Sequence, residues 1–546
     1  MNANLNITLA QLNPSVGDLD GNAKKMLKIW EEHNANSHII VFPELFLCGY
    51  QPEDLILNHE FLCEIEDTIK SIQGKSKNFK SAALIPAPYR KDGKTYNAVY
   101  LIEGGTIKHI QGKHLLPTYG VFDENRIFAA GPLPSPIEFC GLKLGILICE
   151  DIWFDDIPAH FGRHKVDLVL SIHGSPFDEA KMQERLRVCR KATELAKSPL
   201  IYLNMIGGQD ELAFDGRSFV MNGLGEVIKE SPAFEDHILS VETENIQHMA
   251  PIESEENPPE LIYAALKTGL RDYVHKSGFK TMLLGLSGGI DSALSAAIAV
   301  DALGKENVQC IMLPSAFTSK DSLEDAKKCA KLLGTSYEII EIEEAVETFE
   351  KIIPDLKDLA HENMQSRTRG LILMALSNAR GNMLLTTGNK SEMAVGYATI
   401  YGDMNGGWNA LKDIYKTDVY KLAQWRNAQS QVIPERIITK APSAELRKDQ
   451  TDQDNLPPYD ILDTILQVLI EYAHIDWSKI TEPALLEKKK LCDENPKMVQ
   501  KIAKLLKNSE YKRRQSPPGT KITTCAFTKE RRYPIANAHT NMVKES

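Results

Sequence analysis

The chain has 546 residues, of which 43% are hydrophobic and 25% are charged, so it is too long for one hydrophobic core and predicts two or more globular domains. Its net charge of -11 argues against broad electrostatic binding of nucleic acid, which needs clustered positive charge. The N-terminus lacks the features of a signal peptide, and no apolar run is long enough to span a membrane, which predicts a cytoplasmic protein. The nine cysteines show no zinc-type spacing and are expected to be free thiols.

Short apolar runs typical of β-strands dominate the first 246 residues. They lie at 6–12, 38–44, 81–88, 97–103, 143–150, 167–173, 199–205, 217–223 and 237–242. Helical spacing is found between them at 21–35 and 181–197. Many strands alternating with few helices predict a layered α/β domain over residues 1–246. Residues 247–259 are rich in Pro, Glu and Asn and predict a linker.

Residues 260–546 show a different rhythm, in which single strands and helices alternate. Helices are expected at 261–278, 292–303, 322–334 and around 367–381, and strands at 281–287, 308–314, 337–342 and 382–389. This order predicts a parallel, doubly wound, Rossmann-like sheet. Residues 511–534 are rich in Pro, Gly and Arg, a composition typical of a solvated tail.

The segment GLSGGIDSALS, residues 285–295, predicts a phosphate-binding loop. A strand runs into Ser287-Gly288-Gly289, and a helix is expected to begin near Asp291, so backbone N–H groups and the helix N-terminus can face an anion. The Walker lysine is absent and Asp291 stands in its place. A carboxylate beside a phosphate indicates Mg²⁺ between them, and therefore ATP. The alternative is an ordinary Gly-Gly turn capped by Asp or Ser.

The motif SGGIDS resembles the loop of the PP-loop ATP pyrophosphatases, and the long segments 384–423 and 441–463 resemble NAD synthetases. The resemblance implies adenylation of the carboxylate of deamido-NAD by ATP, followed by attack of ammonia. It implies ATP contacts at Gly285, Leu286, Ser287, Gly288, Gly289, Ile290, Asp291, Ser292, Thr387, Lys416 and Ser443. It implies deamido-NAD contacts at Asn363, Glu392, Asp403 and Lys512, with Mg²⁺ near Asp291 and Glu392. No tightly bound organic cofactor is expected, and members of this family pair through the synthetase domain, which implies at least a homodimer.

Three segments of the first domain that are interpreted as strand ends, HIIVFPELFLCGY, QGKHLLPTYGVFDE and LGILICEDIW, contain the polar residues Glu44, Lys113 and Cys149. Taken singly, they are interpreted as a solvated loop acid, a surface charge and a buried apolar filler. Together they resemble the Glu-Lys-Cys triad of the nitrilase, or carbon-nitrogen hydrolase, superfamily, which implies an αββα sandwich over most of residues 4–245. The resemblance makes Glu44 the general base, Lys113 the cationic stabiliser and Cys149 the nucleophile that becomes a glutamyl thioester.

Glutamine-using members of that superfamily imply three further contacts, at Tyr119, Ser175 and Lys181. Lys181 suits the substrate carboxylate by charge, although it also fits an exposed position at a helix start. Glu150 and Asp151 follow Cys149 directly, and a negative charge disfavours a thiolate. If the strand continues through this point, Glu150 points away from Cys149, because successive side chains face opposite sides.

The combined prediction is a glutamine-hydrolysing enzyme that amidates deamido-NAD to NAD, releasing glutamate, AMP and pyrophosphate, with ammonia passing through a protein-lined tunnel. One alternative is another PP-loop amidotransferase, such as a GMP or asparagine synthetase, but these pair the loop with other glutaminase folds. A tRNA-thiolating PP-loop enzyme is disfavoured, because such enzymes often add cysteine pairs and basic surfaces. The last alternative is an inactive nucleotide-binding scaffold. This alternative is disfavoured because Glu44, Lys113 and Cys149 are all present in segments that match the superfamily.

Overall fold

A computed structural model describes residues 4–253, 257–443, 445–447 and 450–536 of the chain. The chain divides into two compact units, Met1–Asn257 and Pro258–Ser546. Within the expected linker, residues 254–256 lie outside the described part, and a helix already begins at Pro258. No helix in the described part has the length and apolar content needed to cross a bilayer.

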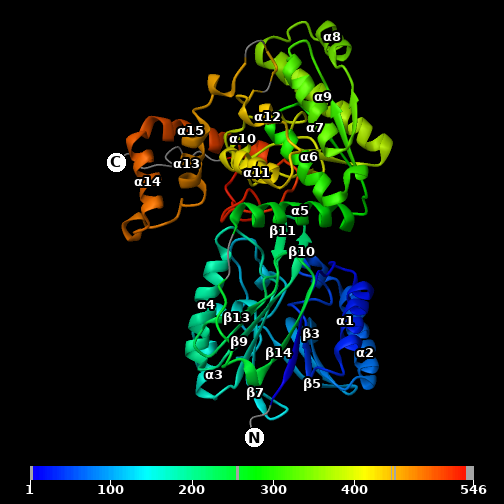
Figure 1. Ribbon diagram of the computed structural model, residues 1–546, viewed down its shortest axis with the longest axis vertical. Helices are drawn as coiled ribbons and strands as arrows, with labels where there is room; N and C mark the ends of the chain where they lie inside the picture. Colours follow the sequence, from blue (N-terminus) through cyan, green and yellow to red (C-terminus); the bar gives the residue numbers. More distant parts are fainter. Residues whose placement is uncertain (1–3, 254–256, 444, 448–449, 537–546) are drawn as a thin grey trace. The chain divides into compact units, whose positions relative to one another are not determined.

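The N-terminal unit contains two six-stranded sheets (Figure 1). The first sheet has the order β14-β1-β2-β3-β4-β5, and the second β13-β12-β9-β8-β7-β6. The strands are β1 Asn6–Gln11, β2 Ile39–Val41, β3 Ala82–Lys91, β4 Lys94–Glu103, β5 Thr106–Gly112, β6 Ile137–Phe139, β7 Leu142–Ile148, β8 Leu168–His173, β9 Leu200–Asn204, β12 Phe219–Met221, β13 Val227–Glu230 and β14 His237–Glu242. A separate hairpin joins β10 (Ile206–Gln209) to β11 (Leu212–Asp215). In each sheet three parallel strands are flanked by antiparallel ones.

Helices cover the outer faces of these two sheets, which completes the αββα sandwich that the resemblance implied (Figure 1). Helices α1 (Leu19–His33) and α2 (His59–Lys75) cover the first sheet, and α3 (Asp156–Arg163) and α4 (Lys181–Ala196) the second. The strands alternate between layers. Leu84 of β3 packs in the core between the sheets, whereas Ile85 packs against α1 and α2. Both faces of each sheet are therefore buried, and this explains why the strands are almost wholly apolar.

The strand β7 ends at Ile148, one residue before Cys149. Cys149 begins a 3-10 turn that ends at Trp153, and its φ of 47° lies in the left-handed region that non-glycine residues seldom adopt. The expected extended geometry is therefore wrong at this point. The charge of Glu150 raises the pKa of the Cys149 thiol, so Glu150 does influence the cysteine.

The C-terminal unit contains a five-stranded parallel sheet with the order β17-β16-β15-β18-β19. Its strands are β15 Met282–Gly285, β16 Val308–Met312, β17 Ser336–Ile339, β18 Met383–Thr386 and β19 Trp408–Asn409. The chain starts at the central strand, builds outward to β17, and then returns to add β18 and β19 on the other side. This is the predicted doubly wound order, and it places a topological switch point between β15 and β18, where such sheets bind ligands.

Twelve helices are described in this unit: α5 Pro258–Lys276, α6 Ile290–Leu303, α7 Lys320–Leu333, α8 Glu343–Ile352, α9 Asp358–Arg380, α10 Lys390–Val395, α11 Lys416–Gln429, α12 Glu435–Thr439, α13 Tyr459–Ile470, α14 Pro483–Glu494, α15 Pro496–Asn508 and α16 Glu510–Arg513. Helices α13 and α15 share an apolar core with α10.

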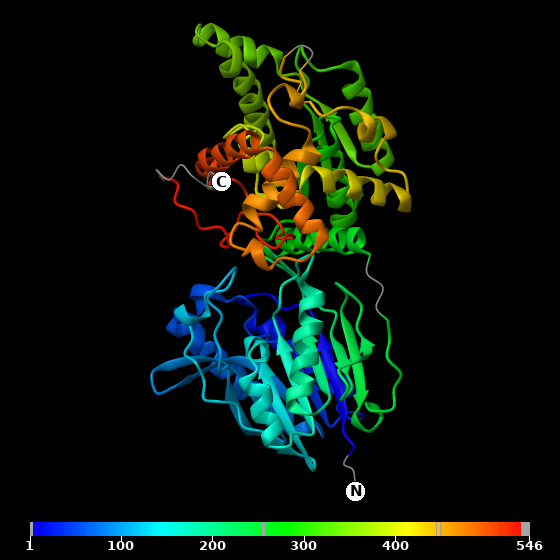
Figure 2. The ribbon, with the colours of Figure 1, turned by 90° about the vertical axis from the view of Figure 1, so that its left-hand side faces the viewer.

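The segment after α16 is packed into the unit, so the interpretation of residues 511–534 as a solvated tail is wrong. In Figure 2 this red segment runs back toward α5 and the orange helices of the same unit. Thr520 and Ile522 are 1% exposed, and the Thr523 hydroxyl contacts the buried Lys390 ammonium. The Ile522 and Thr523 N–H groups both donate to Asp413, at 2.7 and 2.8 Å. Backbone and side-chain bonds to buried charges thus fix a segment whose composition alone suggests disorder.

Candidate active sites

The first site lies at the carboxyl ends of strands from both sheets of the N-terminal unit. Glu44 follows β2, Lys113 follows β5 and Cys149 follows β7. Lys113 and Glu44 are 0% exposed and Cys149 is 4% exposed. The Lys113 ammonium donates to Glu44 Oε1 at 2.7 Å. Three residues that are far apart in the sequence are thus brought into one buried cluster.

Glu44 is held by hydrogen bonds to both carboxylate oxygens. Asn97 donates to Oε1 at 2.8 Å, and the backbone N–H of Gly174, the residue directly after β8 of the second sheet, donates to Oε2 at 2.9 Å. Together with Lys113, these donors fix the orientation of a carboxylate that would otherwise be costly to bury.

Lys113 contacts a second acid, Glu124, which the sequence reasoning missed. Its ammonium lies 2.9 Å from Glu124 Oε1, and that oxygen also accepts the Tyr50 hydroxyl at 3.0 Å. Burial lowers the pKa of Lys113, but Glu124 and Glu44 outweigh it and raise this pKa well above its ordinary value. Burial in turn raises the pKa of Glu124 to about 7, against the pull of Lys113. The sequence signal for this residue is only the acid Glu124 in the segment VFDENR, residues 121–126.

The surroundings of the Cys149 thiol favour its protonated form. Burial raises its pKa well above the ordinary value, and Glu44 adds to this effect while Lys113 opposes it. A neutral thiol beside a carboxylate and an ammonium can lose its proton to the carboxylate as it attacks, and the ammonium can stabilise the negative charge that develops.

The three residues predicted to bind glutamine lie in different environments. Tyr119 is half-exposed and donates its hydroxyl to Glu150 at 2.9 Å. The Lys181 ammonium lies 4.4 Å from the centre of the Trp153 ring, and its charge lowers the pKa of Glu150, which burial raises. These two residues therefore surround Glu150, the acid next to the nucleophile, which the sequence reasoning treated only as an obstacle.

Ser175 belongs to a buried network on the other side of Gly174. Its hydroxyl accepts from Arg185 Nε at 3.2 Å, and its carbonyl accepts from Arg185 Nη2 at 2.9 Å. Arg185 is 1% exposed and makes a two-oxygen ion pair with Asp215 at 2.9 Å. This network fixes the loop that presents the Gly174 N–H to Glu44.

Asp151 ties the turn at Cys149 to the segment that follows Lys113. Its Oδ1 accepts the N–H groups of His114 and Leu115 at 3.1 and 2.9 Å, and its Oδ2 accepts the Ile148 N–H at 3.2 Å. It is 0% exposed, and burial raises its pKa to about 6.

We expect Asp151→Asn to lower the free energy of unfolding by about 1–3 kcal/mol, because the new amide turns an N–H donor toward a buried N–H. Asp167→Asn is the matched control. Asp167 is exposed, and its Oδ2 accepts the N–H of Lys143 at 2.7 Å near the start of β7, the strand that ends at Ile148. This control should change the free energy by less than about 0.5 kcal/mol. Urea titration followed by glutaminase activity measures both, and equal shifts would rule out a special role for Asp151.

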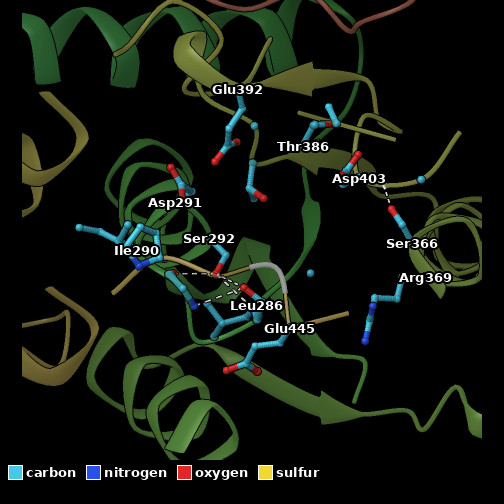
Figure 3. Close-up of a pocket in the computed structure, with 18 of the residues that line it drawn as sticks. Leu286, Ile290, Asp291, Ser292, Ser366, Arg369, Thr386, Glu392, Asp403 and Glu445 are labelled. Carbon is cyan, nitrogen blue, oxygen red and sulfur yellow. Dashed lines mark hydrogen bonds between the residues drawn. The ribbon is translucent and has the colours of Figure 1, made fainter. Parts of the chain in front are cut away.

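The second site is a cavity of about 310 Å³ at the switch point of the C-terminal sheet (Figure 3). Every residue predicted to contact ATP lines it, and so do Glu392 and Asp403. Figure 3 shows Asp291 and Glu392 together at one end, with Asp403, Ser366 and Arg369 toward the other.

The loop between β15 and α6 has the geometry that the glycines predicted. Gly288 has a φ of 83°, and a Cβ there would lie 2.4 Å from the Ser322 carbonyl oxygen, so only glycine fits. The Ser292 hydroxyl accepts the Ser287 N–H at 3.2 Å and donates to the Gly289 carbonyl at 2.9 Å. These bonds hold the loop at the N-terminus of α6 in an open turn facing the cavity.

Lys416 lies between the two predicted metal ligands. Its ammonium contacts the Asp291 carboxylate and lies 3.3 Å from Glu392 Oε1. Asn389 donates to the other Asp291 oxygen at 2.9 Å. Burial raises the pKa of Glu392 to about 8, although Lys416 lowers it. Two carboxylates thus converge on a single cation, and among the described residues no set of three His, Cys, Asp or Glu side chains is grouped closely enough to hold a metal alone.

The four residues predicted to contact deamido-NAD gather around the loop 396–403. Asn363 of α9 accepts the Thr399 hydroxyl at 2.8 Å, and the Thr399 N–H donates to Asp403 at 2.6 Å. Lys512 donates to the carbonyls of Gly396 and Ala398 at 2.9 and 2.7 Å. Asn363 and Lys512 do not line the cavity themselves and instead support the loop at its edge.

Several residues that line the cavity were missed by the sequence reasoning, and Arg369 and Glu445 are two charged examples. Arg369 is partly buried, and this burial lowers its pKa to about 10. Glu445 accepts hydrogen bonds from Ser319, Ser322 and Lys440 at 2.8–2.9 Å. Arg369 is the third residue after the segment HENMQS, and no local pattern separates it from the nearby Arg367.

Comparisons with known proteins agree with both units. The family model for carbon-nitrogen hydrolases matches residues 6–247, and the one for NAD synthases matches residues 262–516. The chain is 43% identical to a glutamine-dependent NAD(+) synthetase of Aquifex aeolicus, over 98% of this chain and 99% of the relative. It is 42% identical to one of Rhodobacter capsulatus, over 97% and 98% of the two chains.

A solved structure gives the same result for the fold. The glutamine-dependent NAD(+) synthetase of Acinetobacter baumannii, determined in complex with ADP, is 38% identical and has a TM-score of 0.76, with 98% of this chain and all of that chain covered. Identity of this size over nearly the whole length of both chains, with both units matched, shows that this chain belongs to the family of glutamine-dependent NAD(+) synthetases.

Proposed function

We propose that the chain converts deamido-NAD to NAD with ATP and the amide nitrogen of glutamine. The single observation that carries this proposal is that one chain of this family contains a buried Glu44-Lys113-Cys149 cluster as well as a phosphate-loop cavity. The first can release ammonia, and the second has the features that adenylation requires. No other described feature gives the released ammonia a use.

In the glutaminase reaction, Cys149 Sγ attacks the carbonyl carbon of the glutamine side chain. Its proton passes to Glu44, and Lys113 stabilises the oxyanion. Glu44 then gives the proton to the leaving nitrogen, so ammonia departs and a thioester remains. Water attacks the thioester with Glu44 as base, and glutamate leaves. Tyr119, Lys181 and Ser175 are proposed to hold the α-amino and carboxylate groups of the substrate.

In the synthetase reaction, a carboxylate oxygen of deamido-NAD attacks the α-phosphorus of ATP, and pyrophosphate leaves. The N-terminus of α6, which begins at Ile290, stabilises the departing charge. Lys416 is placed to bind the phosphates, because its ammonium contacts Asp291 and Glu392 beside the phosphate loop. Ammonia then attacks the acyl carbon, and AMP leaves. Asn363, Asp403 and Lys512 are proposed to position deamido-NAD.

Asp291 and Glu392 fit a Mg²⁺ ion that also binds phosphate. Both carboxylates contact the Lys416 ammonium, so they lie close enough together to bind one cation. Mg²⁺ commonly binds one or two protein carboxylates and completes its coordination shell with phosphate oxygens and water. When bound, the ion supplies Lewis-acid stabilisation of the phosphates.

Removal of divalent cations with EDTA should abolish NAD formation and leave glutamine hydrolysis unchanged, because the Cys149 cluster uses only side chains. Added Mg²⁺ should restore synthesis. The two activities are measured as NAD formed and as glutamate formed, and loss of glutaminase activity under EDTA would contradict this division.

The test of the acceptor is a product assay with glutamine, ATP and Mg²⁺, and with either deamido-NAD or xanthosine monophosphate. Amide formation only with deamido-NAD supports the proposal, and amination of xanthosine monophosphate overturns it.

The same assay with ¹⁵N-amide glutamine and added ¹⁴N-ammonium tests transfer of ammonia through the protein, since a protected route predicts product labelled almost entirely with ¹⁵N.

A homodimer through the synthetase unit is proposed on the exposed apolar residues of α9. Leu359 and Leu371 are 67% and 62% exposed, and Tyr401, on the loop that touches α9 at Gly370, is 69% exposed. Leu371, next to Gly370, and Tyr401 are the centre of the proposed surface, because exposed apolar patches mark protein interfaces. The cytoplasmic location also stays a prediction, supported by nine free thiols.

We expect Leu371→Glu to convert the dimer to monomer, measured by light scattering after gel filtration. Leu224→Glu serves as the control, because Leu224 is 82% exposed on the other unit. A wild-type protein that is monomeric at micromolar concentration would contradict the proposed dimer, and dissociation caused by both variants would contradict the proposed surface.

A further inference from the structure

A second lysine besides Lys416 lines the synthetase cavity, and the resemblance to NAD synthetases did not include it. This residue is Lys440, which directly follows α12 and lies three residues before the predicted ATP contact Ser443. The side chain of Lys440 is 30% exposed, whereas that of Lys416 is 2% exposed. The Lys440 ammonium is therefore within reach of a ligand that enters the cavity.

The carboxylate of Glu445, which also lines the cavity, is bound by a set of donors at the N-terminus of α7. Its Oε1 accepts from Lys440 Nζ at 2.8 Å and from the hydroxyls of Ser319 and Ser322 at 2.9 and 2.8 Å. Its Oε2 accepts the Ser319 N–H at 3.2 Å. An ammonium, two hydroxyls and a backbone N–H at a helix start are donors that also suit a phosphate group. The wall of the cavity thus contains an anion-binding position, and Glu445 fills it.

Glu445 is ionised in this position. Burial raises the pKa of its carboxyl group, but the hydrogen bonds from Lys440, Ser322 and Ser319 outweigh burial and lower this pKa below its ordinary value. A full negative charge therefore lies on these donors. A second anion that approaches the same donors is repelled by Glu445 as long as this carboxylate stays in place.

The anion-binding position lies next to the phosphate loop. Ser322 packs against Gly288 so closely that a Cβ on this glycine would lie 2.4 Å from the Ser322 carbonyl oxygen. Figure 3 shows Glu445 on the side of the loop away from Glu392. The Glu392 side of the loop already has a lysine in contact with its carboxylates, and Lys440 supplies positive charge on the other side. A triphosphate bound at the loop is therefore close to both lysines.

We propose, on the basis of the synthetase function proposed above, that Lys440 binds the terminal phosphates of ATP and that Glu445 competes with these phosphates for it. Phosphate oxygens use the same donors as a carboxylate, and two anions on one ammonium repel each other. When the triphosphate binds, Lys440 and the two serine hydroxyls exchange Glu445 for phosphate oxygens. When pyrophosphate leaves, Glu445 accepts from them again. Glu445 thus lowers the affinity of the cavity for ATP and for pyrophosphate.

The test is NAD formation by the full-length protein with ammonium as nitrogen source, at saturating deamido-NAD and Mg²⁺ and with ATP varied. Lys440→Gln should raise the KM for ATP about tenfold and leave kcat within about twofold, because the lost contact is made before and during the reaction alike. Glu445→Gln should lower this KM by about threefold or more, because it removes the competing charge and keeps the shape of the side chain. The inhibition constant for pyrophosphate should move in the same direction as KM in each variant, and that for AMP should stay within about twofold.

The matched controls are Lys421→Gln and Asp418→Asn, which break a lysine-carboxylate pair of 2.8 Å that lies outside the cavity on the same unit. Both should leave the KM for ATP within about twofold of the wild-type value. A raised KM in Glu445→Gln would mean that Glu445 holds Lys440 in place for ATP, and an unchanged KM would mean that the pair is only structural. Either result overturns the proposal.

Glu445→Gln decides the matter by its KM alone if Lys440→Gln does not fold. The proposed function fails in a different way, since a wild-type protein that forms no NAD would refute it before any variant is compared. NAD formation by the wild type, together with KM values that contradict the expected directions, would leave the function intact and remove only the roles of Lys440 and Glu445.

Discussion

Replacing Cys149 with alanine should lower glutamine-driven NAD formation by on the order of 10⁴-fold, and synthesis driven by added ammonium should keep its wild-type rate. The thiol is the only atom of the buried cluster that can form the thioester, whereas Glu44 and Lys113 can only move a proton and stabilise charge. Because Cys149 is 4% exposed and alanine is smaller, the variant should fold, and its ammonia-driven activity reports this directly. NAD formed from each nitrogen source, at saturating ATP and deamido-NAD, gives both numbers.

The control for this experiment is Cys140→Ala, which removes an exposed thiol that the mechanism does not use. It should change neither activity. Loss of both activities in Cys149→Ala would contradict the assignment of separate sites, and retained glutamine-driven synthesis would contradict the assignment of Cys149 as the nucleophile.

The second large effect is expected at Asp291. Asp291→Asn keeps the size of the side chain and an oxygen for Asn389, but it removes the charge that Lys416 contacts and that a metal would need. NAD formation should fall by about 10²–10³-fold with glutamine and with ammonium alike. Glutamine hydrolysis, measured as glutamate, should persist, because the Cys149 cluster is built entirely from the N-terminal unit.

Asp301→Asn is the matched control for Asp291, since it changes an acid at the other end of the same helix. Asp301 binds Arg426 and Tyr263, so its loss should affect stability more than the turnover rate at 25 °C. A similar fall in turnover for both variants would show that α6 had been disturbed as a whole, and the role of Asp291 would have to be abandoned.

The positions of most strands and the turn chemistry of the phosphate loop could be predicted because they depend on local patterns. The apolar runs gave most strands of both units, and the glycines of SGGIDS gave the turn before α6, since Gly288 admits no side chain. Helix α2 was missed although Phe61, Leu62, Ile65, Ile69 and Ile72 are spaced as a buried helical face. The resemblance to nitrilases was needed to join Glu44, Lys113 and Cys149, because each is ordinary in its own segment.

The parts that could not be predicted depend on contacts between distant residues. Glu124 acquires its importance only because Lys113 and Tyr50 meet it in the folded unit. The effect of Glu150 on Cys149 depends on a 3-10 turn, and nothing in the run LGILICEDIW shows that the strand ends at Ile148. The segment after α16 was misread because Lys390 and Asp413, more than 100 residues earlier, supply the bonds that fix it.

That last segment bears on the order in which the enzyme becomes active during its synthesis. Ser516 and Pro517 line the cavity, and the Pro518 carbonyl accepts the Asn409 N–H at 2.8 Å. Domains generally fold as units, N-terminal first, as the chain leaves the ribosome. The glutaminase unit is therefore complete once residue 257 has been made, whereas the wall of the synthetase cavity is complete only after Ser516 and Pro517 have been made. A nascent or prematurely stopped chain would hydrolyse glutamine with no acceptor for the ammonia.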